Sequence, residues 1–232
     1  MSNETDFETY VYVGNDKYSI SSFSKIDNKL SFKDEYYFSK FQVNNYNLND
    51  FLDKNIFKIE KKNNQFIKSV NLIVCDKKIL SIFLALKKNL SNNQVTEKDK
   101  LNILADMKDY LEKNYHDYFI LHLIIDNYLA NNIAVEAFKT NNICQNFSIE
   151  AKFIVIPKIQ FYYYEQIFKK YEIAINKIIC GNYIKSYFKN VSIDECEMGL
   201  KINLGYNSND VLLLKKNVEN KGFFEKFFDF FK

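Results

Sequence analysis

Residues 10–23, YVYVGNDKYSISSF, are the part of the sequence that decides the fold. Tyr10–Val13 and Tyr18–Phe23 are short runs rich in aromatic and β-branched residues, and both are typical of strands. The four residues between them, Gly14-Asn15-Asp16-Lys17, are a turn signal. We therefore expect the chain to open with an antiparallel hairpin.

The segments that follow extend this hairpin into a mixed α/β protein. Glu35–Val43 predicts a third strand, and Asn47 is a suitable N-cap for the helix after it. A middle region then reads strand, strand, helix, strand, strand. Thr96 is the predicted N-cap of its helix, with Asp99 in the capping-box position. The four strands of the middle region are expected at Ser69–Val74, Ile79–Leu86, Phe119–Ile125 and Ile149–Ile156.

The one proline of the chain, Pro157, closes that middle region. Two helices with a strand between them come next. The last two predicted strands form a hairpin around the loop 205–210. In order, these elements are expected at 159–171 (helix), 173–179 (strand), 181–188 (helix), Gly199–Leu204 (strand) and Val211–Leu214 (strand).

The composition is that of a globular protein, because 47% of the 232 residues are hydrophobic and 26% are charged. These values exclude a disordered chain, a collagen-like chain and a disulfide scaffold. The net charge is +3, and the 32 basic residues, all lysine, are interspersed with 29 acidic ones. A nucleic-acid binder usually shows a basic stripe and arginines for bidentate contacts. We expect no nucleic-acid partner.

The sequence offers no motif for metal binding or catalysis. The four cysteines form no CxxC pair and are expected to be reduced, mostly buried thiols. His116 and His122 lack the spacing of zinc ligands and a nucleophile-elbow context. For His122, in an apolar strand, a hydrogen-bonded core or surface histidine is the simpler interpretation. We expect no metal, no cofactor and no enzymatic activity.

The last eleven residues, GFFEKFFDFFK, predict an amphipathic helix. At 100° per residue all six of their phenylalanines fall within an arc of about 160°, and the charged residues occupy the rest. Such a short helix needs a surface to fold on. That surface is either a membrane interface or a groove on this protein or a partner. The expected membrane-binding residues are Phe223, Phe224, Phe227, Phe228, Phe230 and Phe231.

Four stretches are similar to those of the bacterial cell-division protein FtsA, an actin-like ATPase with an inserted subdomain called 1C. The resemblance implies an actin-like (RNase H-like) subdomain 1A carrying a β-β-α-β-β insert, and a membrane-targeting helix where this chain has its phenylalanines. The stretches are Gln94–Asp99 (the VT-x-x-D helix opening), Ile120–Ile124 with Tyr128 (vLHvi…Y), Ile149–Ile156 (the last strand of the insert) and Cys196–Gly205 (eLGv-x-x-viDiG).

The two phosphate-binding hairpins of the family are altered here. The family's D-I-G-T-S-K reads Tyr12-Val13-Gly14-Asn15-Asp16-Lys17, so a tyrosine replaces the aspartate. Its D-I-G-G-G-T-T-D reads NLGYNSND at 203–210, which lacks two glycines. Gly14, Lys17, Gly205 and Asp210 are the relic positions, although plain turn glycines are the simpler interpretation of Gly14 and Gly205. We expect no ATP binding.

The resemblance suggests how the chain is divided. The expected parts are 10–67 (subdomain 1A, first part), 68–157 (1C-like insert), 158–214 (subdomain 1A, second part, with the start of subdomain 2A), 215–221 (linker) and 222–232 (membrane helix). The rest of the family's second half, including the subdomain 2B that binds the tail of FtsZ, is expected to be missing.

The resemblance also implies a function. We expect a non-catalytic adaptor on the cytoplasmic face of the inner membrane at the division site, with lipid and divisome proteins as partners. Contact with FtsZ and self-association stay open. The alternative is a membrane-associated actin-like adaptor of another assembly, such as a type IV pilus platform.

Overall fold

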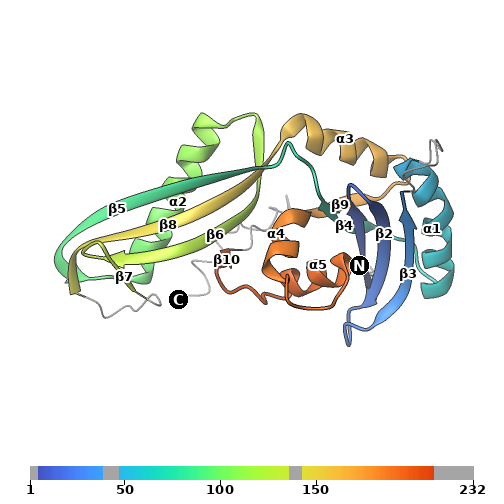
Figure 1. Ribbon diagram of the computed structural model, residues 1–232, viewed down its shortest axis with the longest axis horizontal. Helices are drawn as coiled ribbons and strands as arrows, with labels where there is room; N and C mark the ends of the chain where they lie inside the picture. Colours follow the sequence, from blue (N-terminus) through green and yellow to red (C-terminus); the bar gives the residue numbers. More distant parts are fainter. Residues whose placement is uncertain (1–4, 39–46, 136–142, 212–232) are drawn as a thin grey trace. The chain divides into compact units, whose positions relative to one another are not determined.

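The residues that the structure describes form two sheets, each with its own helices. The computed structural model describes residues 5–38, 47–135 and 143–211 (Figure 1). Of these residues, unit 1 comprises those up to Ile79 together with Ile159–Tyr206, and unit 2 comprises those of Leu80–Lys158 together with 207–211. The expected α/β class is confirmed, because strands and helices occur in both units.

The sheet of unit 1 has the strand order β3-β2-β1-β4-β9. β1, β2 and β3 are joined antiparallel, as predicted for the opening hairpin, whereas β4 and β9 extend β1 in parallel. The strands are β1 (Phe7–Val13), β2 (Lys17–Ser24), β3 (Leu30–Tyr37), β4 (Ser69–Val74) and β9 (Ala174–Cys180).

Helices cover both faces of this sheet. α1 packs against the face of β2 that carries Tyr18, whose ring lies 5.7 Å from that of Phe51. α5 packs against the opposite face, where the Cys196 thiol lies 3.7 Å from the Ser19 hydroxyl, because successive residues of a strand point to opposite sides. The helices are α1 (Leu48–Asn63), α3 (Lys158–Lys169), α4 (Gly181–Tyr187) and α5 (Glu195–Asn203).

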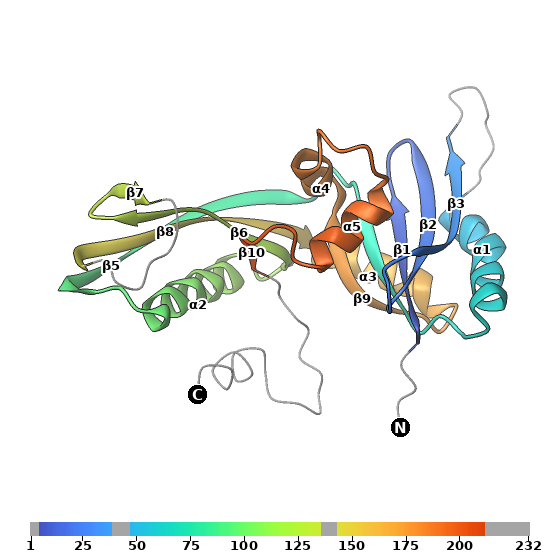
Figure 2. The ribbon, with the colours of Figure 1, turned by 90° about the horizontal axis from the view of Figure 1, so that it is seen from below.

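The sheet of unit 2 has the strand order β10-β6-β8-β5, and a short strand, β7, also pairs with β6. One face packs on α2, where Met107 and Leu111 meet Phe153 and other side chains of β8 in a buried core; Figure 2 shows α2 running along that sheet. The elements are β5 (Leu80–Gln94), α2 (Glu97–Asn114), β6 (Tyr118–Ala130), β7 (Ile133–Val135), β8 (Ile143–Pro157) and β10 (Asp210–Val211).

The predicted helix caps are confirmed. The Asn47 side chain accepts hydrogen bonds from the backbone N–H groups of Asn49 and Asp50. Thr96 and Asp99 form a reciprocal capping box at the start of α2. Each cap satisfies N–H groups that have no partner within the helix itself.

Several strands differ from their predictions. The third strand begins at Leu30 rather than Glu35, because Asn28 adopts a left-handed conformation that closes the β2–β3 turn early. It is described as far as Tyr37, and the predicted residues 39–43 lie outside the described residues. Ser69–Val74 is a strand, but it pairs with β1 and β9 in unit 1 and is not the first strand of the predicted middle region. Unit 2 also contains β7, which was not predicted.

The predicted strand Gly199–Leu204 is wrong, since residues 195–203 form helix α5. Asp194 caps this helix by accepting a hydrogen bond from the Glu197 N–H at 2.9 Å. The hairpin expected between 199 and 214 is therefore absent from the described residues. Of the predicted second strand, Val211–Leu214, only Val211 is described, and it lies in the short strand Asp210–Val211, which pairs with β6.

The C-terminal phenylalanine segment and the linker before it lie outside the described residues. Across residues 5–38, 47–135 and 143–211, no helix is long and apolar enough to cross a membrane. None of the four cysteines forms a disulfide and all four are buried, as expected for structural thiols.

Candidate functional site

The β1–β2 hairpin of unit 1, the first predicted phosphate-binding loop, is filled by one of its own side chains. Gly14 N–H donates to the Lys17 carbonyl at 3.0 Å and closes the turn. Tyr12, completely buried, folds its ring over Gly14 so closely that a Cβ atom at Gly14 would clash with it. Position 14 therefore needs a glycine to leave space for the Tyr12 ring, and this packing explains the glycine without a bound phosphate.

The hydroxyl of Tyr12 is held from two sides. The Lys185 Nζ of α4 donates a hydrogen bond to it at 2.6 Å, and the thiol of Cys75 lies 3.5 Å away. Burial raises the pKa of Tyr12 well above its usual value, and the hydrogen bond with Cys75 adds to that. The side chain is therefore a neutral phenol at physiological pH.

Lys17, the second predicted relic of this loop, is fully paired within unit 1. Its Nζ lies 2.7 Å from Glu35 Oε1 on β3 and 2.9 Å from Glu195 Oε2 on α5. Burial alone would lower the pKa of Lys17, but the hydrogen bonds to these carboxylates raise it above its usual value. Lys17 thus acts as a buried link between a strand and a helix.

Glu195 joins this pair to Tyr12, because its other oxygen lies 3.2 Å from Lys185 Nζ. Burial alone would raise the pKa of Glu195, but the hydrogen bonds that it accepts, first from Lys17, lower it. Glu195 is therefore charged at neutral pH and pairs with two lysines at once.

A third lysine extends the network on the same face of the sheet. Lys33 Nζ lies 3.0 Å from Asp194 Oδ2 and 3.5 Å from Glu35 Oε2. We call the connected residues the hairpin cluster. It contains three lysines and three carboxylates, so its formal charges sum to zero. Its members are Tyr12, Lys17, Lys33, Glu35, Cys75, Lys185, Asp194 and Glu195.

The structure gives the other two predicted relics different roles. Gly205, with a φ of 80°, ends helix α5. Its N–H donates to the Ile202 carbonyl at 3.0 Å, and the Tyr206 N–H donates to the Lys201 carbonyl at 3.1 Å. This is a Schellman motif, which requires a left-handed residue and favours glycine. Gly205 is a helix C-cap glycine, and no strand precedes it.

Asp210 lies in unit 2 on β10, where it is buried against His122 of β6. The Asp210 Oδ2 and His122 Nδ1 atoms are 2.9 Å apart, and both side chains are almost completely inaccessible. This contact adds to the pairing of the two-residue strand β10 with β6 at the edge of the sheet. The expectation that His122 is a hydrogen-bonded residue of the core is confirmed.

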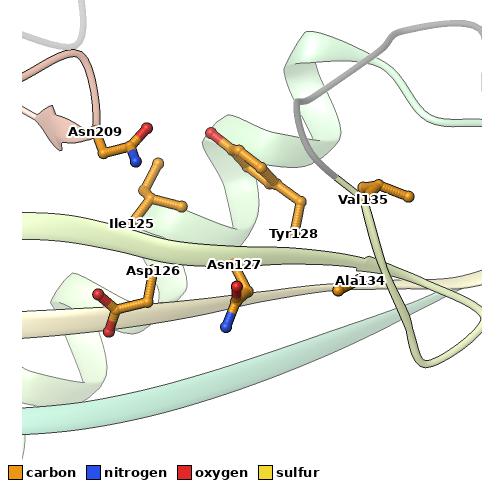
Figure 3. Close-up of a pocket in the computed structure, with 7 residues that line it drawn as sticks. All are labelled: Ile125, Asp126, Asn127, Tyr128, Ala134, Val135 and Asn209. Carbon is orange, nitrogen blue, oxygen red and sulfur yellow. The ribbon is translucent and has the colours of Figure 1, made fainter.

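Unit 2 also contains a pocket of about 280 Å³ beside the β6–β7 hairpin (Figure 3). Asp126 is an extra residue in β6, because Ile125 pairs with Ala151 whereas Asn127 pairs with Glu150. This β-bulge lets Ile125 and Tyr128 point to the side of Asn209 while Asp126 and Asn127 point to the other (Figure 3). The lining residues are Ile125, Asp126, Asn127, Tyr128, Ala134, Val135 and Asn209.

The pocket is built on firmly held groups. The Tyr128 ring stacks on Phe147, and the Lys100 ammonium lies 5.7 Å from its centre. Burial, with a smaller effect of Glu97, raises the pKa of Tyr128 to about 12. The Ile125 N–H donates to the Asn209 carbonyl at 2.9 Å, which fixes the rim. At this volume the pocket suits a single side chain better than a nucleotide.

Two features of these sites were missed in the sequence. Glu35 and Glu195 lie far apart along the chain, and nothing local marks them as partners of Lys17. The pocket had a weak signal, because Asp126 and Asn127 interrupt an apolar strand. Within the described ranges, no cluster of three or more potential metal ligands occurs.

Comparisons with known proteins give partial structural likenesses. No protein-family model and no curated protein matches the chain. The PilM-PilN type IV pilus biogenesis complex is similar at 5% identity with a TM-score of 0.48, over 78% of this chain and 49% of that one. The cytoplasmic domain of EpsL, an inner membrane component of the type II secretion system of Vibrio cholerae, is similar at 9% with a TM-score of 0.37, over 77% and 57%.

A third solved structure is a Bacteroides thetaiotaomicron protein described as having an actin-like ATPase fold and unknown function. It is 14% identical with a TM-score of 0.33, over 79% of this chain and 56% of that one. The chain thus spans about half the length of the structures that it resembles. At these identities and TM-scores, the likenesses identify neither a family nor an activity.

Proposed function

We propose that this protein is a non-catalytic adaptor that binds the cytoplasmic face of a bacterial inner membrane and holds other proteins there. The observation that carries the proposal is the buried ring of Tyr12 over Gly14. A hairpin that cradles phosphate needs open backbone N–H groups and a cation free to meet the anion. Here the ring covers the turn, and Lys17 lies between two carboxylates.

Release of Lys17 for a nucleotide would be costly. A phosphate group would have to displace Glu35 or Glu195 from Lys17, leaving a half-buried carboxylate with one of its two lysines, Lys33 or Lys185. A buried charge left with no partner costs about 3–5 kcal/mol, so the loss of one of two partners should cost about 2 kcal/mol. We therefore expect phosphate release from ATP, measured with the full chain and Mg²⁺, to equal that of buffer. Turnover that disappears in Lys17→Ala would contradict a non-catalytic role.

The membrane part of the proposal rests on the six phenylalanines of residues 222–232. Their burial among acyl chains would contribute on the order of 10 kcal/mol before ordering costs. We expect the full chain to co-sediment with liposomes and a chain that ends at Asn220 to stay in the supernatant. The matched control is Phe57→Ser in the full chain, which removes an exposed phenylalanine of α1 and leaves the C-terminal segment intact. Equal sedimentation of the full and shortened chains would contradict the membrane role.

The adaptor part rests on unit 2, which presents a pocket of side-chain size instead of an enclosed cavity. The quoted sequence motifs favour an FtsA-like role in which this unit recruits divisome proteins. The alternative is a role in another envelope assembly, such as a type IV pilus platform. Pull-down with the full chain separates them, because division proteins, FtsZ included, are captured in the first case and pilus or secretion components in the second. Asn209→Trp, which fills the pocket, should abolish capture.

A further inference from the structure

Strand β5 of unit 2 has one edge that no strand covers among the described residues. It pairs with β8 over most of its length, and the sheet order places it outermost; Figure 1 shows it as the outer strand of that sheet. The outer edge of such a strand presents backbone N–H and C=O groups ready to pair with another strand.

The sequence of this edge lacks the usual protection. From Leu80 to Leu86 it reads LSIFLAL, with no charge, proline or glycine. Proteins normally protect an exposed edge with charged residues, prolines or bulges. The one irregularity of the β5–β8 pairing lies between Asn89 and Asn93, beyond this run. A strand of this composition is an aggregation hazard when its edge is open, which favours a specific occupant.

The pattern of side chains in this run reads the same in both directions. Large residues stand at both ends, and small residues, Ser81 and Ala85, stand next to them. Ile82 and Leu84 flank the central Phe83, whose side chain is 69% exposed. A strand with this symmetry is complementary to an antiparallel copy of itself, as a two-fold interface requires.

We propose that β5 pairs antiparallel with β5 of a second copy of this chain, with a two-fold axis at Phe83. The two sheets then form one continuous sheet across the dimer. Phe83 lies opposite Phe83 of the second copy, and the small residues on either side leave space for the two rings. Ile82 lies opposite Leu84, and Leu80 lies opposite Leu86. No charged residue falls within these seven pairs.

Lysines limit the pairing to this register. Continuing it by two residues would bring Lys78 opposite Lys88 of the second copy, and like charges directly opposite destabilise a strand pair. A shift that centres the axis on Leu84 brings Lys88 opposite Leu80. A shift to Ile82 brings Lys78 opposite Leu86, and Lys78 lies before the strand begins. The axis at Phe83 alone uses the whole uncharged run.

The test is the molar mass of the full chain in solution, measured by sedimentation equilibrium. We expect a dimer for the wild type and a dimer weakened roughly tenfold or more for Phe83→Lys, which places two lysines opposite each other. The matched control is Phe57→Lys on α1, since Phe57 is 68% exposed and lies outside the proposed interface. It should dimerise like the wild type.

A charge swap tests the register itself. Phe83→Glu alone should be as weakened as Phe83→Lys, but an equimolar mixture of the two variants should form a heterodimer at wild-type strength. A monomeric wild type would overturn the proposal and leave the edge to a strand of another protein. An oligomer that persists in Phe83→Lys, for example through the C-terminal phenylalanines, would also overturn it. So would a mixture that stays monomeric.

Discussion

The two units differ in whether their polar groups are paired internally or leave a surface open to a partner. In unit 1 the hairpin cluster pairs every lysine that it contains with a carboxylate of the same unit. In unit 2 the β6–β7 hairpin opens a pocket, and β5 leaves a long uncharged edge. The difference shows that a group in a ligand-binding position is informative only when its partners are known. A lysine at a phosphate-loop position becomes a structural residue once two carboxylates hold it.

Among the substitutions that test this comparison, removing the ring of Tyr12 should lower the free energy of unfolding the most. Tyr12→Ala deletes a fully buried aromatic side chain and should lower the free energy of unfolding by about 3–5 kcal/mol. Tyr12→Phe keeps the ring and loses only the hydrogen bonds to Lys185 and Cys75, so its loss should be about 1–2 kcal/mol. Urea denaturation measures both. Equal losses would mean that the ring does not fill the hairpin.

Removing the charge of Glu195, the carboxylate that two lysines share, should have the second-largest effect on stability. Glu195→Gln removes an ionic partner from Lys17 and from Lys185, while Lys17 keeps Glu35. We expect a loss of about 2 kcal/mol, below the range for a buried pair that loses its only partner. Glu197→Gln on the same helix is the control, because Glu197 pairs with Lys201 at 3.3 Å near the surface and should cost less than about 0.5 kcal/mol.

The same carboxylate predicts a pH dependence. The pKa of Glu195 is lowered in the folded protein, so its contribution to stability is present above its unfolded pKa of about 4.3. That contribution is lost as the pH falls through the lower folded pKa. Wild type should therefore lose more stability than Glu195→Gln between about pH 5 and pH 2. Parallel unfolding curves for the two proteins across that range would contradict the pairing.

Unit 2 should respond less to loss of its buried pair. Asp210→Ala removes the hydrogen bond to His122 and should cost about 1–2 kcal/mol, measured by thermal denaturation. The effect should be weaker than that of Tyr12→Ala, since Asp210 holds a strand of only two residues. The control is Asp126→Ala, which changes an exposed bulge residue of the same unit and should leave the stability nearly unaltered.

The smallest effect is expected at the helix end. Gly205→Ala places a side chain in a left-handed conformation with no neighbour to clash with, so the loss should be about 1 kcal/mol. Gly205→Asn should lose less, because asparagine tolerates this conformation better. Hydrogen exchange of the last turn of α5 measures the change. An unaltered exchange rate in Gly205→Ala would contradict the role of Gly205 as a helix cap.

Turn and capping residues in the sequence correctly predicted the elements whose ends depend on neighbouring residues of the chain. The glycine turn indicated the β1–β2 hairpin, and Asn47, Thr96 and Asp99 indicated the starts of two helices. The prediction failed at α5 because its apolar residues alternate with small or polar ones as in a strand. Asp194 before this run and Gly205 after it are the capping signals that favour a helix.

The candidate site was only partly visible in the sequence. The replacement of an aspartate by Tyr12 and the loss of glycines at 206–207 are readable along the chain. The two carboxylates that hold Lys17 are not readable along the chain. Glu35 pairs with it from the neighbouring strand β3, and Glu195 pairs with it from a helix far along the chain. Long-range ion pairs leave no local pattern.

Isothermal titration of the full chain with Mg²⁺ and ATP tests the central claim most directly, namely that the phosphate-loop position of unit 1 is closed by Tyr12 and by paired lysines. We predict no saturable heat up to about 1 mM ATP, a bound on the free energy of binding of roughly −4 kcal/mol. Saturable binding with a Kd in the micromolar range, weakened by Lys17→Ala, would contradict it.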